Sequence, residues 1–257
     1  CLVGSEMCIR DRVYIFLSSL NMNFLFKIID FFYQKKKYSF LKKKISKDMD
    51  ILIDVGAQHG DTINEFLDIF SIKQIYAFEP SKKNFIKLKK KVEKIKKKRS
   101  VEIKIFPFGL GKKEEILDLN EITDGVSNTF NNLNFDSPYF KKKKLFTTLF
   151  GIKRFIKNKV STKIICLKEF IKKENIDKID FIKIDTEGFE FNILLGLEED
   201  IKKTHYILFE HHYDNMIIKN YKFTDIHKLL KNNGFQKIFK TKMPFRKSFD
   251  YIYENKN

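Results

Sequence analysis

Carboxylates that could bind or activate a ligand follow several apolar runs of this 257-residue chain. Asp54 lies near the end of the run at 51–55, and a turn containing Gly56 and Gly60 follows it. Glu79 ends the next apolar run. Glycines let the backbone approach a ligand closely, and a carboxylate after the second strand can bind both hydroxyls of a ribose. These two signals together predict a site for an adenosine-containing cofactor.

The glycine spacing in this turn does not match the fingerprint G-x-G-x-x-G, which cradles the pyrophosphate of a dinucleotide. A ligand without a pyrophosphate needs only a looser turn. Asp54 can then orient the loop or reach a cofactor ammonium through water. An NAD-dependent oxidoreductase that binds its ribose through Glu79 is the alternative, and the incomplete glycine pattern argues against it.

A second acidic cluster follows the apolar run at 179–184. Asp185 comes directly after this run, and Glu187 and Glu190 stand close behind it. Ligands of open α/β sheets bind beyond the carboxyl ends of the strands, so these acids should gather near the glycine turn. Capping of a helix N-terminus explains one of them, but three acids exceed what capping requires. Lys183, inside the run, either extends outward or pairs with one of the acids.

The third cluster ends the apolar run at 205–210. Glu210 stands at its end, and His211 and His212 follow. An imidazole titrates near neutrality, so His211 is a candidate general base, and we expect Asp185, Glu210 and His211 to be catalytic. The two acids and a histidine could instead hold a divalent metal. Because neighbouring side chains of a strand point to opposite faces, the histidine pair is a poor chelate, and we expect no metal.

Short apolar runs alternate with helical patterns, which predicts a mostly parallel sheet with helices on both faces. Strands are expected near 51–55, 74–79, 101–106, 179–184 and 205–210, and helices near 60–70, 82–96, 167–174, 189–195 and 223–232. The tail differs, since only a loop containing Pro244 separates strand-like runs at 235–240 and 248–253. A connection this short favours antiparallel pairing, so the sheet should end in an antiparallel hairpin.

Three segments fall outside the alternating pattern. Residues 1–12 (CLVGSEMCIRDR) resemble a translated sequencing adapter, so we treat them as non-native and regard Met22 as a candidate start. Residues 13–48 predict a helical extension with an apolar face that packs on the domain or contacts a membrane surface; polar interruptions make it a poor transmembrane span. Residues 120–160, rich in Asn and Lys, predict a lid or substrate-shaping insertion in the main domain, 49–257.

The composition limits the kinds of partner that we expect for this chain. The net charge is +18, but only five of the 51 basic residues are Arg. Lys is weaker than Arg in bidentate recognition of phosphates and bases, so we interpret the charge as a solvated surface and expect no specific nucleic acid. A basic RNA- or membrane-binding module without catalysis is the other alternative. With residues 1–12 set aside, Cys166 is the one native cysteine, which fits a reducing cytoplasmic setting.

Four motifs, in their order along the chain, resemble the FkbM family of S-adenosylmethionine-dependent methyltransferases. They lie at 53–60, 77–80, 182–190 with 195–196, and 207–210. The run at 183–190, Lys-Ile-Asp-Thr-Glu-Gly-Phe-Glu, is the most specific to the family. The likeness covers residues 50–213. The chain departs from the family at Cys166-Leu-Lys168, where Thr-Leu-Asp is common, and at Gln58, where Asn is common.

The resemblance implies a class I methyltransferase with a Rossmann-like, seven-stranded sheet whose last strand is antiparallel. It implies S-adenosylmethionine as cofactor and O-methylation of a hydroxyl on a sugar, a glycan or a small metabolite. Glu79 would bind the ribose, Gly56 and Gly60 would border the methionine part, and the segment 106–111 would lie near the adenine. The expected cofactor-binding residues are Asp54, Gly56, Ala57, Gly60, Glu79, Pro80, Gly109, Asp185 and Glu187.

Overall fold

The computed structural model describes residues 22–122, 128–149, 156–244 and 246–257. The chain divides into two units, one ending at Ile45 and the other running from Ser46 to Asn257. The first unit contains helix α2 (Met22–Lys44), whose last turn holds three lysines. Residues 1–12, and the part of the predicted extension before Met22, lie outside the described residues. None of the described helices combines the length and the apolarity that crossing a membrane requires.

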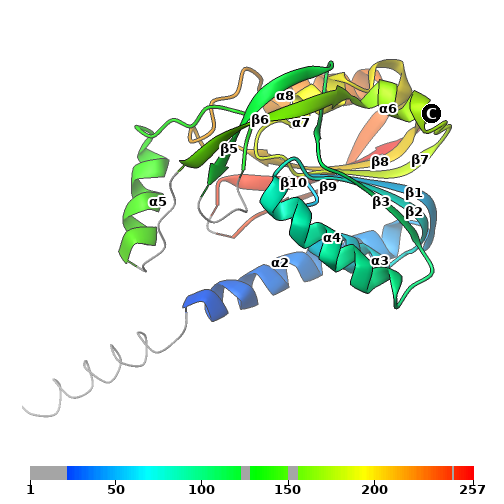
Figure 1. Cartoon of the computed structure of the whole chain (residues 1–257), viewed down its shortest axis with the longest axis horizontal. Coiled ribbons are helices and arrows are strands. Elements are labelled where there is room, and N and C mark those ends of the chain that lie inside the picture. Colours follow the sequence, from blue (N-terminus) through cyan, green and yellow to red (C-terminus); the bar gives the residue numbers. More distant parts are fainter. Residues whose placement is uncertain (1–21, 123–127, 150–155, 245) are drawn as a thin grey trace, which may run out of the picture. The chain divides into compact units, whose positions relative to one another are not determined.

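The second unit is built on a seven-stranded sheet (Figure 1). Its strands are β1 (Asp48–Val55), β2 (Ser71–Phe78), β3 (Glu102–Phe106), β7 (Ile179–Ile184), β8 (Thr204–His212), β9 (Phe235–Lys242) and β10 (Ser248–Asn255). Their order is β3-β2-β1-β7-β8-β10-β9. The first five in this order pair in parallel, whereas β10 is antiparallel to both β8 and β9. The predicted mostly parallel sheet with its C-terminal antiparallel hairpin is confirmed.

Helices cover both faces of this sheet (Figure 1). The helices are α3 (Asp61–Leu67) and α4 (Lys82–Lys96) on one face, and α6 (Leu167–Lys173), α7 (Glu190–Leu195) and α8 (Phe223–Asn232) on the other. Phe66 of α3 meets Phe181 of β7 edge to face, while Phe170 of α6 meets Tyr76 and Phe78 of β2. A 3-10 turn, η1 (Glu198–Lys203), leads into β8. Burial of both faces explains why the strands are nearly continuous apolar runs.

A second, three-stranded sheet is not predicted by the sequence pattern. It consists of β4 (Gly109–Gly111), β5 (Glu115–Ile122) and β6 (Ile156–Cys166), in the order β4-β6-β5. Helix α5 (Pro138–Leu149) stands between β5 and β6 in the chain. The segment 120–160, expected to be a lid or a substrate-shaping loop, therefore supplies parts of two strands as well. Charged and polar residues interrupt β5, and its partner β6 begins far along the chain, so no local pattern marks the pair.

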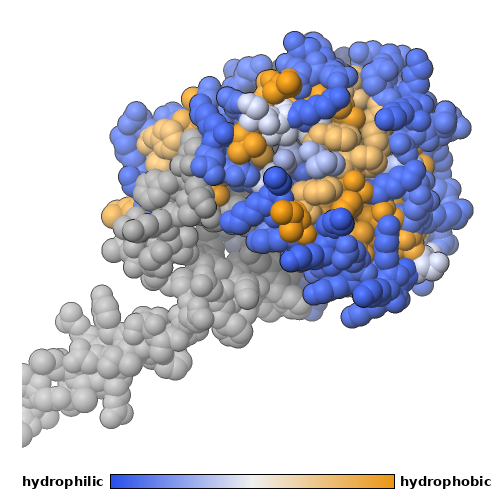
Figure 2. All heavy atoms as spheres, viewed as in Figure 1, coloured by the Kyte–Doolittle hydropathy of each residue, from blue (hydrophilic) through white to orange (hydrophobic). Residues whose placement is uncertain are grey.

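Exposed ion pairs are common on the second unit. Lys73 lies 2.6 Å from Asp50, and Lys91 lies 2.9 Å from Asp61. Pairs of this kind add little to stability because water screens both charges. Hydrophilic side chains dominate the molecular face drawn in Figure 2, with apolar side chains between them.

Candidate active site

A cleft opens where β1, β2 and β7 end. The turn after β1, the residues after β2 and the loop after β7 all contribute to it. Its lining residues are Gly56, Gln58, Glu79, Pro80, Asn84, Leu119, Asn128, Phe130, Asp185, Thr186 and Glu187. Five predicted cofactor-binding residues thus line one cleft: Gly56, Glu79, Pro80, Asp185 and Glu187. The carboxyl edge of the parallel strands is where such sheets bind ligands.

The glycine turn after β1 has a shape that only glycine fits at its first position. Gly56 has a φ of +78°, and a Cβ there would lie 2.0 Å from the carbonyl oxygen of Asp185. The N–H groups of Gly56 and Ala57 both donate to the carbonyl of Phe78, at 3.0 Å. Gly60 donates to the carbonyl of Ala57 and precedes α3. Ala57 and Gly60 therefore shape the turn without lining the cleft.

Glu79 is the buried acceptor at the end of β2. Its side chain accepts the N–H of Gln58 at 2.8 Å and that of Ser81 at 2.9 Å, and the residue is only 3% exposed. Burial raises the pKa of Glu79 to about 7, although both N–H bonds and the Asn84 amide oppose this rise. A carboxylate held by backbone donors beside a cleft can still accept from ligand hydroxyls, because each oxygen has two lone pairs.

A buried ion cluster lies beneath the cleft. The ammonium of Lys183 is 3.0 Å from Asp54 and 3.6 Å from Asp185, and it donates to the carbonyl of Gly56 at 3.1 Å. Burial alone would lower the pKa of Lys183, but the charges of Asp54 and Asp185 outweigh burial and raise it. For the carboxyl group of Asp54 burial acts in the other direction and raises the pKa. Lys183 thus pairs with the acids instead of extending outward. Asp54 does not line the cleft, and it orients the glycine turn by holding Lys183, which donates to the carbonyl of Gly56.

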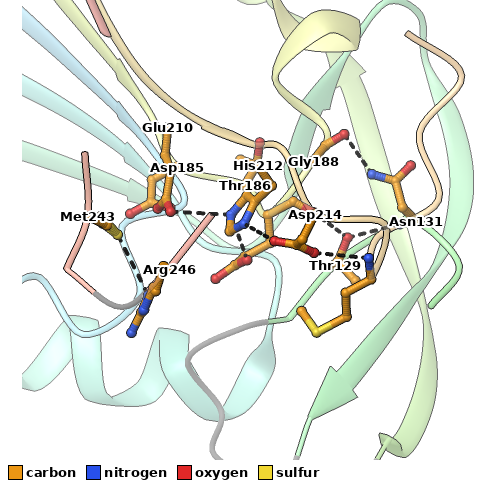
Figure 3. A network of polar contacts seen from close by, with 12 residues as sticks. Thr129, Asn131, Asp185, Thr186, Gly188, Glu210, His212, Asp214, Met243 and Arg246 are labelled. Carbon is orange, nitrogen blue, oxygen red and sulfur yellow. Dashed lines mark hydrogen bonds and ion pairs between the residues drawn. The ribbon is translucent and has the colours of Figure 1, made fainter. Parts of the chain in front are cut away.

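Strand β8 brings Glu210 and His212 to one face, beside the loop after β7. The Nε2 atom of His212 lies 3.1 Å from Glu187 and 3.4 Å from Glu210, and its Nδ1 lies 3.6 Å from Asp214. Figure 3 shows His212 between Glu210 and Asp214. Burial raises the pKa of Glu210 to about 8. Burial would lower the pKa of His212, but the charges of Glu210 and Glu187 raise it well above its usual value.

His211, the predicted base, points to the other face of β8. Its ring packs edge-on against Tyr213 and lies near Tyr221 and Phe223. Burial lowers the pKa of His211 to about 3. The structure therefore brings Asp185 and Glu210 together with His212, a residue outside the predicted set. The catalytic role of His211 stays a prediction.

The chain following β5 ties the two active-site loops together. Thr129 donates to the carbonyl of Glu187 at 2.7 Å, and Asn131 donates to that of Gly188 at 2.6 Å (Figure 3). Farther along, the N–H of Asn134 donates to the carbonyl of Met216 at 2.8 Å. We call residues 128–134 the strap. It shapes the cleft through Asn128 and Phe130, and it holds the loop that follows β8.

One further acid, Glu190, and one further glycine, Gly109, support the site from outside the cleft lining. Glu190 accepts the N–H of Gly188 at 2.8 Å and the hydroxyl of Tyr221 at 2.5 Å, so it stabilises the loop after β7 and does not cap the N-terminus of α7. Gly109 does not line the cleft. A Cβ on Gly109 would lie 2.6 Å from Ile164 and 3.1 Å from Phe130, so this glycine leaves room for the ring of Phe130.

A larger pocket of about 610 Å³ has His212 in its lining. Its lining residues are Asn134, His211, His212, Tyr213, Asp214, Asn215, Ile217, Ile218, Lys219, Tyr221, Lys222, Phe223 and Thr224. Because Glu187 lines the cleft and His212 lines the pocket, the two hollows border on the contact between these side chains. Within the described residues, no group of three His, Cys, Asp or Glu side chains is arranged to hold a metal ion.

A family model described as the methyltransferase FkbM domain matches residues 54–237, which include the cleft, the strap and the ion clusters. The chain belongs to the FkbM family. The matched family is one of methyltransferases that depend on S-adenosylmethionine. No curated protein gives a significant match.

Solved structures of methyltransferases are similar to this chain. An FkbM methyltransferase from Methylobacillus flagellatus has 14% identity and a TM-score of 0.53, over 84% of this chain and 48% of that one. The chain thus spans about half the length of that relative. Magnesium protoporphyrin IX methyltransferase from Synechocystis, with bound S-adenosylmethionine, has 9% identity and a TM-score of 0.49, over 90% and 79% of the two chains. TrmK of M. capricolum, with S-adenosylhomocysteine, has 13% identity and a TM-score of 0.48, over 86% and 68%.

The residues around the cleft suit the cofactor of an FkbM methyltransferase by their chemistry. The close approach of Gly56 to Asp185 leaves a cradle that a side chain at position 56 would fill. Glu79 places a buried carboxylate where ribose hydroxyls are bound in such sheets. Phe130 and Leu119 add apolar surface that suits a purine ring. Leu119 comes from the unpredicted sheet and Phe130 from the strap, so the sequence motifs did not mark them.

Proposed function

We propose that this FkbM methyltransferase methylates a hydroxyl oxygen on a sugar, a glycan or a small metabolite. The observation that carries the proposal is the contact of 3.1 Å between Glu187, which lines the cofactor cleft, and His212, which lines the larger pocket. S-adenosylmethionine supplies a methyl group on a good leaving group when it is bound. The protein then has to align the hydroxyl and accept its proton.

His212 is the proposed base. In its neutral form the imidazole accepts the hydroxyl proton, and the carboxylate of Glu210, 3.4 Å from Nε2, stabilises the imidazolium that results. The same carboxylates raise the pKa of His212, so its base form is populated at a higher pH than that of an ordinary histidine. A group with a pKa near 3 is a weak base, which argues against His211 in this role. Glu210 keeps its predicted catalytic part as the charge partner of His212.

Calorimetry with S-adenosylhomocysteine tests the cofactor site first. Wild-type protein should bind it, and Glu79→Ala should weaken binding, whereas His212→Asn should bind like wild type because His212 lies outside the cleft lining. Absence of binding by the wild-type protein would remove the basis of the proposal.

Transfer of a labelled methyl group to a panel of hydroxylated acceptors tests the chemistry. The product should be a methyl ether that resists mild alkali, and a label on nitrogen, sulfur or a carboxyl oxygen would contradict O-methylation. The rate should rise with pH and then level off. Glu210→Gln should move this rise to lower pH, because it removes a charge that raises the pKa of His212. An unmoved pH profile would reject His212 as the base.

We also propose a cytoplasmic location, which the unpaired, buried Cys166 supports as the one cysteine of the described residues. Contact of the N-terminal helix with a membrane surface stays a proposal as well. A vesicle co-sedimentation experiment with and without residues 1–45 would test it.

A further inference from the structure

The larger pocket has a rigid aromatic wall. Tyr213 lines it and is 44% exposed, which is high for a large ring. Its hydroxyl lies 2.6 Å from that of Tyr251, and its ring meets His211 edge-on with centroids 4.8 Å apart. These contacts hold the ring in one place. An exposed ring of fixed orientation gives a sugar a flat surface to stack on, at little cost in conformational entropy.

A lysine without a carboxylate partner stands in the same pocket. Lys219 is half-buried, and its ammonium donates to the carbonyl of His212 and lies 5.8 Å from the centre of the Tyr221 ring. In the described part of the chain this ammonium forms no ion pair with a carboxylate. Burial lowers the pKa of Lys219, and the charges of Glu190, Asp214 and Glu210 offset only part of this effect. An anion beside Lys219 would restore favourable charge interactions that burial removes.

The other charges that line the pocket do not cancel Lys219. Lys222 adds a second, exposed positive charge. The carboxylate of Asp214 is already engaged, since it lies 3.6 Å from Nδ1 of His212 and accepts the N–H of Met216 at 2.9 Å. The lining therefore carries a positive surplus.

We propose that the acceptor is a sugar with an anionic substituent, a phosphate or a carboxylate, which Lys219 binds while the sugar ring stacks on Tyr213. This inference rests on the proposed O-methylation of a hydroxyl in the same pocket. Lys is a compact point charge, which suits a phosphate or carboxylate oxygen that approaches from varied directions. Tyr213 and Lys219 would thus select the acceptor, and neither takes part in the proton transfer.

Binding of defined probes to the protein saturated with S-adenosylhomocysteine tests the inference. The probes are glucosyl phosphate, glucuronate and glucose, and binding is followed by ligand-observed NMR. At least one charged sugar should bind about tenfold more tightly than glucose, as expected for a hydrogen bond between charged groups. The comparison between glucosyl phosphate and glucuronate tells which anion is used. Inorganic phosphate should compete with the preferred sugar.

The variants assign the effect to Lys219. Lys219→Met should abolish the preference for the charged sugar, Lys219→Arg should keep most of it, and Lys228→Met, which removes a charge of α8 outside the pocket lining, should leave it unchanged. Equal binding of charged and neutral sugars, no binding of any charged probe, or an unchanged preference in Lys219→Met would each overturn the inference. Unaltered affinity for S-adenosylhomocysteine shows that each variant is folded. It also separates this test from a failure of the proposed methyl transfer, which loss of cofactor binding would reveal.

Discussion

The buried carboxylate of Glu79 makes cofactor binding depend on pH. Its pKa in the free protein is about 7, because burial disfavours the charge despite two backbone N–H donors. Ribose hydroxyls donate hydrogen bonds to the ionised form, so binding of S-adenosylhomocysteine favours the carboxylate and releases a proton wherever Glu79 was protonated. Affinity should therefore rise with pH up to about 7 and then level off.

The size of this effect follows from the pKa. One pH unit below the pKa only about a tenth of the molecules carry the ionised carboxylate, so the dissociation constant should be about tenfold higher at about pH 6 than at about pH 8. The difference corresponds to about 1.4 kcal/mol. Glu79→Gln removes the titration and presents an amide to the donors of Gln58 and Ser81, so its affinity should be lower at every pH and independent of pH.

Calorimetry across this pH range, in two buffers of different ionisation enthalpy, measures both the affinity and the protons released. Glu210→Gln is the matched control, because it removes another carboxyl with a raised pKa that does not line the cleft. The affinity of Glu210→Gln for S-adenosylhomocysteine should depend on pH as that of the wild-type protein does. A wild-type affinity that does not change with pH, with no proton release below pH 7, would refute the assignment of Glu79 as an ionised ribose acceptor.

Three further predictions concern the fold around the site. Gly56→Ala should bind S-adenosylhomocysteine at least tenfold more weakly in calorimetry. A left-handed φ costs a residue with a Cβ about 1–2 kcal/mol, and the new atom would displace the backbone at Asp185. Binding as tight as that of the wild-type protein would contradict the cradle. Lys183→Met should lower the free energy of unfolding in urea by about 3–5 kcal/mol, since it leaves buried carboxylates uncompensated, whereas the exposed Lys73→Met should change it by less than about 1 kcal/mol; equal effects would argue against the buried pair. The melting temperature should fall as the pH rises from about 5 to about 8, because the raised pKa of Glu210, about 8, makes the folded state bind more protons than the unfolded state, and the raised pKa of His212 acts in the same direction. Calorimetric scans should show a flatter curve for Glu210→Gln.

The main sheet could be predicted because its strands are buried on both faces. Such strands are continuous apolar runs that a residue of different chemistry follows, as Glu79 follows β2 and Asp185 follows β7. The small sheet could not be predicted in this way. Its strand β5 is half-exposed and carries acids, and the strand that pairs with it, β6, begins after α5. Local periodicity holds no information about a partner so distant in the chain.

The proposed base, His212, could not be predicted from the sequence for a related reason. The predicted strand ended at 210, but β8 continues to His212. Because side chains alternate along a strand, Glu210 and His212 share a face and His211 points away. Which histidine joins the acids thus depended on where the strand ends, and strand ends are set by the ladder to β10, where Ser248 pairs with His212. That pairing is formed by the tail, far from the motif itself.

The position of β10 in the sheet has a consequence for synthesis of the protein. This strand lies between β8 and β9, although it follows both in the chain. While a ribosome is still making residues 248–255, β9 has no neighbour in the main sheet and β8 exposes an unpaired edge close to the catalytic residues. The nascent protein should therefore need protection by chaperones until this strand is inserted. Premature termination just before Ser248 should give a product that is degraded or aggregated, because an open strand edge invites pairing with other chains.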